Sequence, residues 1–211
     1  GRIVMLANAG HKPLDTRIFH KEALSLTAAG FHITLIIPHN ESFTREGVVV
    51  KAVPLPRKGW EQLVLCPWRI FRLALKEPRG SVFHIHDSEL LFAGLALRCS
   101  GRKVIYDAHE DTPLQISYQH WIPGFIKPLY SVMYRILEKL AGWCFETILV
   151  AEPVIARYFP PSKVVLIRNF PRMASFKAEV PYAQRDGSLL YVGLLSKPRG
   201  VEEMLEGHRL A

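Results

Sequence analysis

The segment His84–Asp87 reads HIHD and brings two potential metal ligands together with a carboxylate. If this segment is a strand, alternate side chains share a face, so His84 and His86 lie side by side. Three polar residues further along the chain could complete a hydrolytic zinc site with them: His109, Glu110 and Asp111. The structural alternative is that His84 packs against a helix, while Asp87 and Glu89 favour the positive end of the next helix.

His109 is also a candidate acid or base on its own. It directly follows an apolar segment and precedes two acidic residues. The ordinary pKa of histidine lies near neutrality, so this side chain can donate a proton, accept one or stabilise an oxyanion. A structural histidine with satisfied hydrogen bonds explains the same pattern equally well. The residue alone therefore does not decide between catalysis and structure.

A loop with one glycine, Asn8–Leu14, follows the first apolar segment and leads into a helix that begins near Asp15. Glycine lets the backbone approach a ligand, and a helix N-terminus offers free N–H groups and partial positive charge to phosphate. The loop lacks the GxGxxG pattern of dinucleotide-binding proteins. An ordinary turn explains it too, with Asp15 as the N-cap and Arg17 and Glu22 as a surface ion pair.

Short apolar segments precede these polar groups and predict strands that are buried on both faces. They are Arg2–Ala7, Ile33–Ile37, Val82–Ile85, Lys103–Asp107, Thr147–Val150 and Val164–Ile167. Helical patterns alternate with them: Ile18–Thr27 closed by Gly30, a helix beginning near Pro67, Leu90–Arg98 and Pro128–Trp143. This alternation predicts a doubly wound, mainly parallel, Rossmann-like α/β sheet. Ligands bind beyond the carboxyl ends of such strands, so the three polar groups should meet at one edge.

The chain changes character after Ile167, where a polar stretch with prolines begins. We place the first domain at residues 1–170 and an interdomain linker at 171–185. Residues 186–211 would then begin a second, truncated α/β domain, with a strand at Leu189–Val192 and a helix opening at Val201.

Charge and composition narrow the class of protein. The 27 basic residues exceed the 19 acidic ones, which gives a net charge of +8 and favours an anionic partner. An apolar share of 49% excludes a disordered chain. Cys66, Cys99 and Cys144 form no Cys-x-x-Cys pair and predict reduced thiols in a cytoplasmic protein. We expect neither a signal peptide nor a membrane-spanning segment.

The basic segment Arg57–Lys76 contains two tryptophans, and a second aromatic and basic stretch covers Tyr118–Tyr134. One helical face of the first segment would carry Trp68, Arg69, Arg72 and Lys76. The opposite apolar stripe would consist of Trp60, Leu63, Val64, Ile70, Phe71, Ala74 and Leu75. The basic face suits anionic lipid headgroups and predicts a peripheral protein on the inner face of the plasma membrane. The alternative is a core stripe with a solvated basic face. Nucleic acid is not expected, because no recognised binding pattern is present.

Six segments, in order, resemble the retaining GT-B glycosyltransferases of family 4, especially the bacterial branch that serves surface polysaccharides. They read DTRIFHKEALSLTAAGFHITLI, VFHIHDSELL, KVIYDAHEDTP, ILVAEPVIARYF, VVLIRNFP and LLYVGLLSKPRG. The resemblance implies two Rossmann-like domains that face a cleft, with the acceptor on the first and the nucleotide-sugar donor mainly on the second. It implies transfer of a hexose from a nucleotide-diphosphate sugar to a glycan or lipid-linked acceptor, without a metal or other cofactor. We expect this chain alone to be inactive.

The resemblance also implies roles for individual residues. His109 would lie beside the transferred sugar as the catalytic residue. The acceptor would be bound by His11, Asp15, Arg17, His86, Asp87, Glu110 and Asp111. The donor phosphates would be bound by Asn8, Gly10, Gly193, Lys197 and Arg199. The family often has a G-R-x-x-x-x-K-G pattern after the first strand of the donor domain; here Leu194 replaces the first basic residue.

Retaining transfer in this family is commonly described as front-face attack, in which the departing diphosphate takes the proton of the acceptor. No protein nucleophile is then required. Two other functions stay open on the sequence. One is a sugar-nucleotide epimerase or phosphorylase of the same architecture, which would show its own acid pair in the cleft. The other is a non-catalytic binding module, which would bind no nucleotide sugar.

Overall fold

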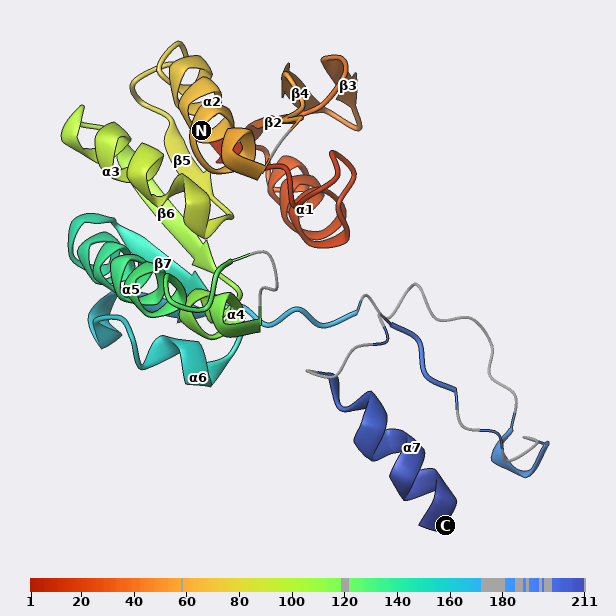
Figure 1. Cartoon of the computed structure of the whole chain (residues 1–211). Helices are drawn as coiled ribbons and strands as arrows, with labels where there is room; N and C mark the ends of the chain where they lie inside the picture. The colour runs from red at the N-terminus through yellow and green to blue at the C-terminus, as the bar shows by residue number, and fades with distance from the viewer. Residues whose placement is uncertain are drawn as a thin grey trace. The chain divides into compact units, whose positions relative to one another are not determined.

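The chain consists of two compact units, Gly1–Asn169 and Phe170–Ala211. A computed structural model describes residues 1–57, 59–118, 122–171, 181–184, 188, 190–193, 195 and 199–210 (Figure 1). The first unit contains the sheet and the polar residues that follow its strands β1, β5 and β6.

One eight-stranded sheet, in the order β3-β4-β2-β1-β5-β6-β7-β8, forms the centre of the first unit. Its strands are β1 Arg2–Leu6, β2 His32–Pro38, β3 Phe43–Arg45, β4 Val48–Val53, β5 Val82–Ile85, β6 Lys103–Ala108, β7 Thr147–Val150 and β8 Val164–Leu166. Neighbouring strands are parallel except β3 and β4, which pair antiparallel. The predicted α/β class and mainly parallel sheet are confirmed, and each strand predicted within residues 1–170 is present.

Helices cover both faces of this sheet (Figure 1). Along the chain they are η1 Thr16–Ala23, α1 Leu24–Ala28, η2 Glu61–Leu65, α2 Cys66–Ala74, η3 Ser88–Leu90, α3 Leu91–Cys99, α4 Thr112–Tyr118, α5 Lys127–Cys144, α6 Pro153–Ala156 and η4 Pro161–Lys163. In β1, Val4 and Leu6 belong to the core beneath α2, α3 and α5, whereas Met5 and Ala7 belong to the core beneath η1 and α1. Alternate residues thus enter different cores, which explains why the strand is apolar throughout.

The hairpin of β3 and β4 was not predicted. Its two-residue turn, Glu46 and Gly47, has positive φ angles of 51° and 80°, as a type I′ turn requires. Glutamate rarely adopts positive φ, so the turn signal in the sequence is weak. The hairpin extends the sheet beyond β2 and contributes nothing to the polar edge described below.

The segment before α2 is helical as well, in the wider π-helical form with bonds from residue i to i+5. Cys66 N–H donates to Glu61 O in this pattern. The next bond would need an N–H on Pro67, which proline lacks. The free carbonyl of Gln62 instead accepts a hydrogen bond of 3.0 Å from Asn8 Nδ2, which ties this helical turn to the end of β1. α2 begins at Cys66, close to the predicted start at Pro67.

In the second unit, α7 covers Val201–Leu210, so the predicted helix at Val201 is confirmed. A short 3-10 turn covers Tyr182–Gln184. The predicted strand Leu189–Val192 is wrong for its described residues, since 190–192 adopt no strand. A strand needs a partner for its N–H and C=O groups, and the described part of this unit offers none. No helix in the described ranges is long and apolar enough to cross a membrane.

Candidate active site

A cavity of about 180 Å³ opens at the carboxyl ends of β1, β5 and β6. These strands are neighbours in the sheet, so the residues that follow them meet at one edge. The lining includes Gly10 and His11 after β1, His86 and Asp87 after β5, and His109 and Glu110 after β6. The structure therefore brings together members of all three polar groups that the sequence placed at this edge.

His11 lies between two carboxylates. Its Nε2 is 3.1 Å from Asp87 Oδ1 and its Nδ1 is 3.4 Å from Asp15 Oδ2. Burial alone would lower the pKa of His11, but hydrogen bonds and charges of Asp15 and Asp87 outweigh it and raise the pKa to about 10. At neutral pH His11 is therefore a cation at the cavity wall.

Asp15 is held in place by the helix that it begins. Its Oδ1 accepts the backbone N–H groups of Arg17 and Ile18 at 2.7 Å and 2.9 Å, as an N-cap does. The hydrogen bond with His11 is the main reason why the pKa of Asp15 lies well below its ordinary value. Asp15 is thus an ionised partner of His11 and does not itself line the cavity.

Asn8 positions Asp87. The backbone N–H of Asn8 donates to Asp87 Oδ2 at 2.6 Å, while Oδ1 of the same carboxylate faces His11. The side chain of Asn8 is buried and donates to Gln62 O. Asn8 therefore lies behind the cavity wall, whereas a Cβ built on Gly10 would meet only open space.

Arg17 and Asp107 form a buried ion pair below the cavity. Arg17 Nε and Nη2 donate to the two carboxylate oxygens of Asp107 at 2.9 Å and 2.8 Å. Arg17 Nε also lies 3.0 Å from Glu22 Oε1. The expected pair of Arg17 and Glu22 is thus formed, but it is buried and not on the surface. Arg17 does not line the cavity.

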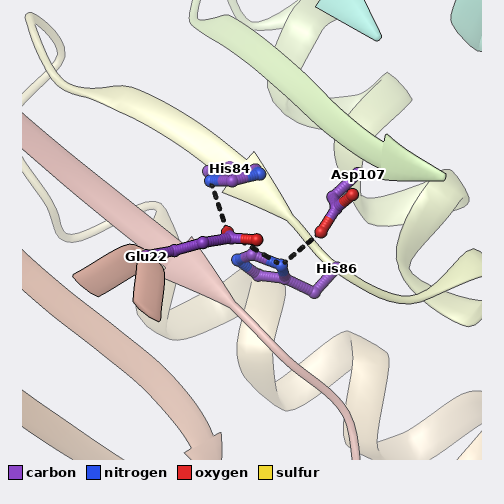
Figure 2. A group of neighbouring side chains, drawn as sticks. All are labelled: Glu22, His84, His86 and Asp107. Carbon is purple, nitrogen blue, oxygen red and sulfur yellow. Dashed lines mark hydrogen bonds and ion pairs between the residues drawn. The ribbon is translucent and has the colours of Figure 1, made fainter. Parts of the chain in front are cut away.

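Four side chains, of which His86 and Asp107 also line the cavity, offer ligand atoms within 4.8 Å of one another: Glu22, His84, His86 and Asp107 (Figure 2). His86 Nδ1 is 3.4 Å from Asp107 Oδ2, and His84 Nδ1 is 4.0 Å from Glu22 Oε2. In a tetrahedral zinc site with bonds of about 2.0 Å, ligand atoms lie ~3.3 Å apart, so the donor set resembles one. However, Arg17 already occupies both oxygens of Asp107 and supplies the positive charge at this point.

This group differs from the metal site considered on the sequence. His84 and His86 do share a face, but their neighbours are Glu22 and Asp107. Of the residues expected beside them, His109 and Glu110 line the cavity instead, and Asp111 does not. Glu22 comes from η1, and the three strands β2, β3 and β4 lie between η1 and β5 in the sequence, so no local pattern could place it here.

Burial governs the protonation of this group. Burial raises the pKa of Glu22 to about 7 and holds the pKa of His84 well below its ordinary value. Burial would likewise raise the pKa of Asp107, but hydrogen bonds from His86 and Arg17 hold it well below its ordinary range. Asp107 is therefore the fixed negative charge of the group, paired with the fixed positive charge of Arg17.

His109 is oriented by the strand that it follows. Its Nδ1 lies 3.2 Å from the carbonyl oxygen of Asp107, which can only accept. In the neutral ring the proton is therefore assigned to Nδ1, which leaves the lone pair on Nε2. The ring is packed edge to face against His11, with centroids 5.8 Å apart. His109 thus presents a hydrogen-bond acceptor next to a cation in the cavity wall.

Asp111 is separated from the cavity. Its Oδ1 accepts the N–H of Leu114 at 3.1 Å and its Oδ2 accepts the hydroxyl of Tyr158 at 3.1 Å. It begins α4, a helix that the sequence analysis missed and that places Thr112 and Gln115 in the cavity wall. The sequence Asp-Thr-Pro is typical of a helix start and would have predicted it.

Four further lining residues were not among the predicted site residues: Ser88, Glu89, Tyr106 and Asp107. Burial and the nearby charge of Asp87 raise the pKa of Glu89. Gly193 and Arg199, predicted to bind phosphate, belong to the second unit, and Lys197 lies outside the described residues.

Residues 16–169 match the family model of the glycosyl transferase 4-like domain. No curated protein matches. Sucrose-phosphate synthase from Thermosynechococcus elongatus shares the fold with a TM-score of 0.58 at 15% identity, over 80% of this chain and 48% of that one. An α,α-trehalose-phosphate synthase (UDP-forming) from Burkholderia vietnamiensis gives a TM-score of 0.50 at 12% identity, over 75% and 42%. The chain thus spans about half the length of these solved structures.

Proposed function

The chain belongs to the glycosyl transferase 4-like domain family, and on that basis we propose that it supplies the acceptor side of a retaining GT-B glycosyltransferase. The enzyme would move a hexose from a nucleotide-diphosphate sugar to a glycan or lipid-linked acceptor in the synthesis of a bacterial surface polysaccharide. The observation that carries the proposal is the cavity at the carboxyl edge of β1, β5 and β6, with His11, Asp87 and His109 in its wall.

Each wall residue suits one part of this reaction. Gly10 leaves open space where a diphosphate could approach the backbone, and the protonated His11 beside it would stabilise the negative charge of the leaving group. Asp87 and Glu110 can accept hydrogen bonds from acceptor hydroxyls. His109 Nε2 can accept one from the transferred sugar. The departing diphosphate would take the proton of the acceptor, so no protein nucleophile is needed.

We propose that transfer needs no metal ion. The support is Arg17, whose guanidinium already pairs with Asp107 and Glu22 in the one described cluster with a metal-like donor set. The proposed chemistry then depends on fixed charges of the protein. One is the His11 cation in the cavity wall, and the others are those of the buried ion pair of Arg17 and Asp107, whose carboxylate contacts His86.

We further propose that residues 1–170 form the acceptor domain, 171–185 a linker, and 186–211 the beginning of the nucleotide-sugar domain. The division of the chain between Asn169 and Phe170 supports this, as does its match to about half of the solved structures. Gly193, Lys197 and Arg199 would then contact donor phosphates from the second domain.

The test is transfer of labelled sugar from nucleotide-diphosphate sugars into a bacterial lipid extract by the enzyme that contains this chain. His109→Ala should lower turnover by roughly a hundredfold with little change in melting temperature, because its Nε2 would face the sugar. His32→Ala, an exposed histidine at the start of β2, is the matched control and should leave turnover unchanged. Epimerised nucleotide sugar without transfer, or full activity of the His109 variant, would contradict the assignment.

A further inference from the structure

The outward face of α5 is apolar. Leu129, Val132, Ile136, Leu140 and Trp143 are between 47% and 72% exposed, at the spacing of one helical stripe. The opposite face of the helix is buried in the core. Large side chains exposed in a continuous stripe mark a contact surface, because soluble proteins rarely leave such a stripe uncovered.

The neighbouring helices continue this surface. α2 packs against α3, and α3 packs against α5, so the three helices form one layer, the outer helical layer (Figure 1). The layer, with the turn η2 that precedes α2, also exposes Trp60, Val64, Trp68 and Phe92. Trp60 and Val64, both in the predicted apolar stripe of this segment, are therefore exposed and not part of the core. Cys66, Ile70 and Ala74 take the buried positions.

The charge of this layer is of one sign. Its helices α2, α3 and α5 carry six basic residues: Arg69, Arg72, Arg98, Lys127, Arg135 and Lys139. Their one acidic residue, Glu138, is buried. Arg72 stacks on the exposed ring of Trp68, with 5.0 Å from its Cζ to the ring centroid. Basic side chains and tryptophans on an apolar surface match the interface of an anionic bilayer.

A second hollow of about 70 Å³ joins the layer to the candidate active site. It shares Ser88, Glu89, Thr112 and Gln115 with the first cavity. Its other walls are apolar or aromatic and come from η2, α4, α5 and the segment before α5: Leu63, Ile116, Ile122, Tyr130 and Tyr134. The polar cavity therefore continues into an apolar space that is lined by η2 and by α5 of the outer helical layer.

We infer that the outer helical layer rests on an anionic membrane surface, with the second hollow admitting the first apolar units of a lipid-linked acceptor. The inference rests on the proposed function and narrows its acceptor to a lipid. Anionic lipid fits this surface better than a protein partner does. The exposed apolar residues are spread over three helices, and the basic residues of these helices are accompanied by one acidic residue, Glu138, which is buried. A second copy of the chain would bring these like charges together.

The test is cosedimentation of the protein with phosphatidylcholine vesicles, with and without phosphatidylglycerol. Binding should require the anionic lipid. Val132→Asp with Ile136→Asp should weaken partitioning by roughly tenfold or more, because these side chains would enter the interface. Val154→Asp, an equally exposed valine on α6, is the matched control and should bind as the wild type does. Circular dichroism should be unchanged in all of them, since the side chains are exposed.

A second pair of variants isolates the charge. Arg72→Glu with Lys139→Glu should weaken binding to anionic vesicles by about tenfold or more. Arg45→Glu with Lys103→Glu changes the net charge equally on exposed strand positions and should have a much smaller effect. Equal loss in both pairs would overturn the inference, as it would show that only net charge matters.

Vesicle binding needs neither donor nor acceptor, so it is separate from the test of transfer. Vesicle binding without any transfer would contradict the proposed function and leave the membrane surface standing. Transfer by a protein that ignores anionic vesicles would overturn the membrane surface alone. A dimer in light scattering that Ile136→Asp dissociates, with no vesicle binding by the wild type, would assign the stripe to a second copy and overturn the inference as well.

Discussion

At the scale of single residues, the site consists of charges fixed by their neighbours. His11 is a cation because two carboxylates flank it, and Asp107 is an anion because Arg17 and His86 bind it. The sequence placed His11, Asp107 and His86 at the correct edge, since each ends or follows a strand. It could not show that Arg17 points into the protein, because that depends on where Asp107 lies across the sheet.

The charge of His11 makes stability depend on pH. Its pKa is raised from 6.5 to about 10, so its ion pairs stabilise the folded state fully below pH 6.5 and are lost as the pH rises through about 10. The difference in unfolding free energy between the wild type and His11→Gln should therefore shrink over this range. Urea denaturation at several pH values measures it. A difference that stays constant with pH would show that His11 is neutral when folded.

At the scale of elements, strands were easier to predict than helices. Most of the predicted strands are largely buried, so they appear as apolar runs in the sequence. β3, at the edge of the sheet, is three residues long and carries Thr44 and Arg45, which hides it; the apolar run of β4, Val48–Val53, is a strand signal that the prediction missed. η2 was missed because Pro67 indicates a helix start, whereas the π-helical turn Glu61–Leu65 precedes it and runs directly into α2.

The link between Asn8 and Gln62 can be tested by a double-mutant cycle. Asn8→Ala should lower the unfolding free energy by about 1–2 kcal/mol, because it leaves Gln62 O without its donor. In a Pro67→Ala background the cost should be smaller, since residue 67 then has an N–H that can bond Gln62 O. Chemical denaturation of the four proteins gives the coupling. Strictly additive losses would contradict this account of the turn.

Gly94 on α3 is a close packing point. A Cβ there would lie 2.9 Å from Ile85 Cδ1 and 2.9 Å from Phe145 Cζ. Helix propensity alone would favour alanine by ~1 kcal/mol, but overpacking costs about 1–3 kcal/mol, so Gly94→Ala should destabilise the fold. Gly207→Ala on α7, where a Cβ meets open space, is the control and should be neutral or stabilising. Thermal unfolding compares them; a stabilised Gly94→Ala would show that the core has room.

At the scale of the whole molecule, one sheet separates two cores, and one helical layer faces outward with apolar and basic side chains. The net charge of +8 and the tryptophans of Arg57–Lys76 predict an anionic partner. The sequence pattern places the basic, tryptophan-bearing face mainly on α2, whereas the longest exposed apolar stripe lies on α5. The reason is that only the packing of the helices decides which apolar face stays exposed to solvent.

The 211-residue chain alone should bind nucleotide-diphosphate sugars weakly, with a dissociation constant above ~1 mM. The reason is that the proposed phosphate contacts beyond Gly10 and His11 lie in the second unit, which in its described part forms no sheet. Isothermal titration calorimetry with the isolated chain measures this. Micromolar binding would mean that the first unit holds the donor by itself.

Asn8 forms hydrogen bonds with two regions, the turn η2 and the cavity wall. Its side chain holds the turn that leads from Trp60 towards α2, and its backbone holds the carboxylate that faces His11. Because both hydrogen bonds come from one residue, η2, which would meet lipid, and Asp87, which would meet sugar, are held in a fixed relation to each other. A redesign of η2 that keeps its place beside the cavity must therefore retain a side-chain amide donor at position 8 for Gln62 O and avoid proline there, which would remove the N–H that holds Asp87.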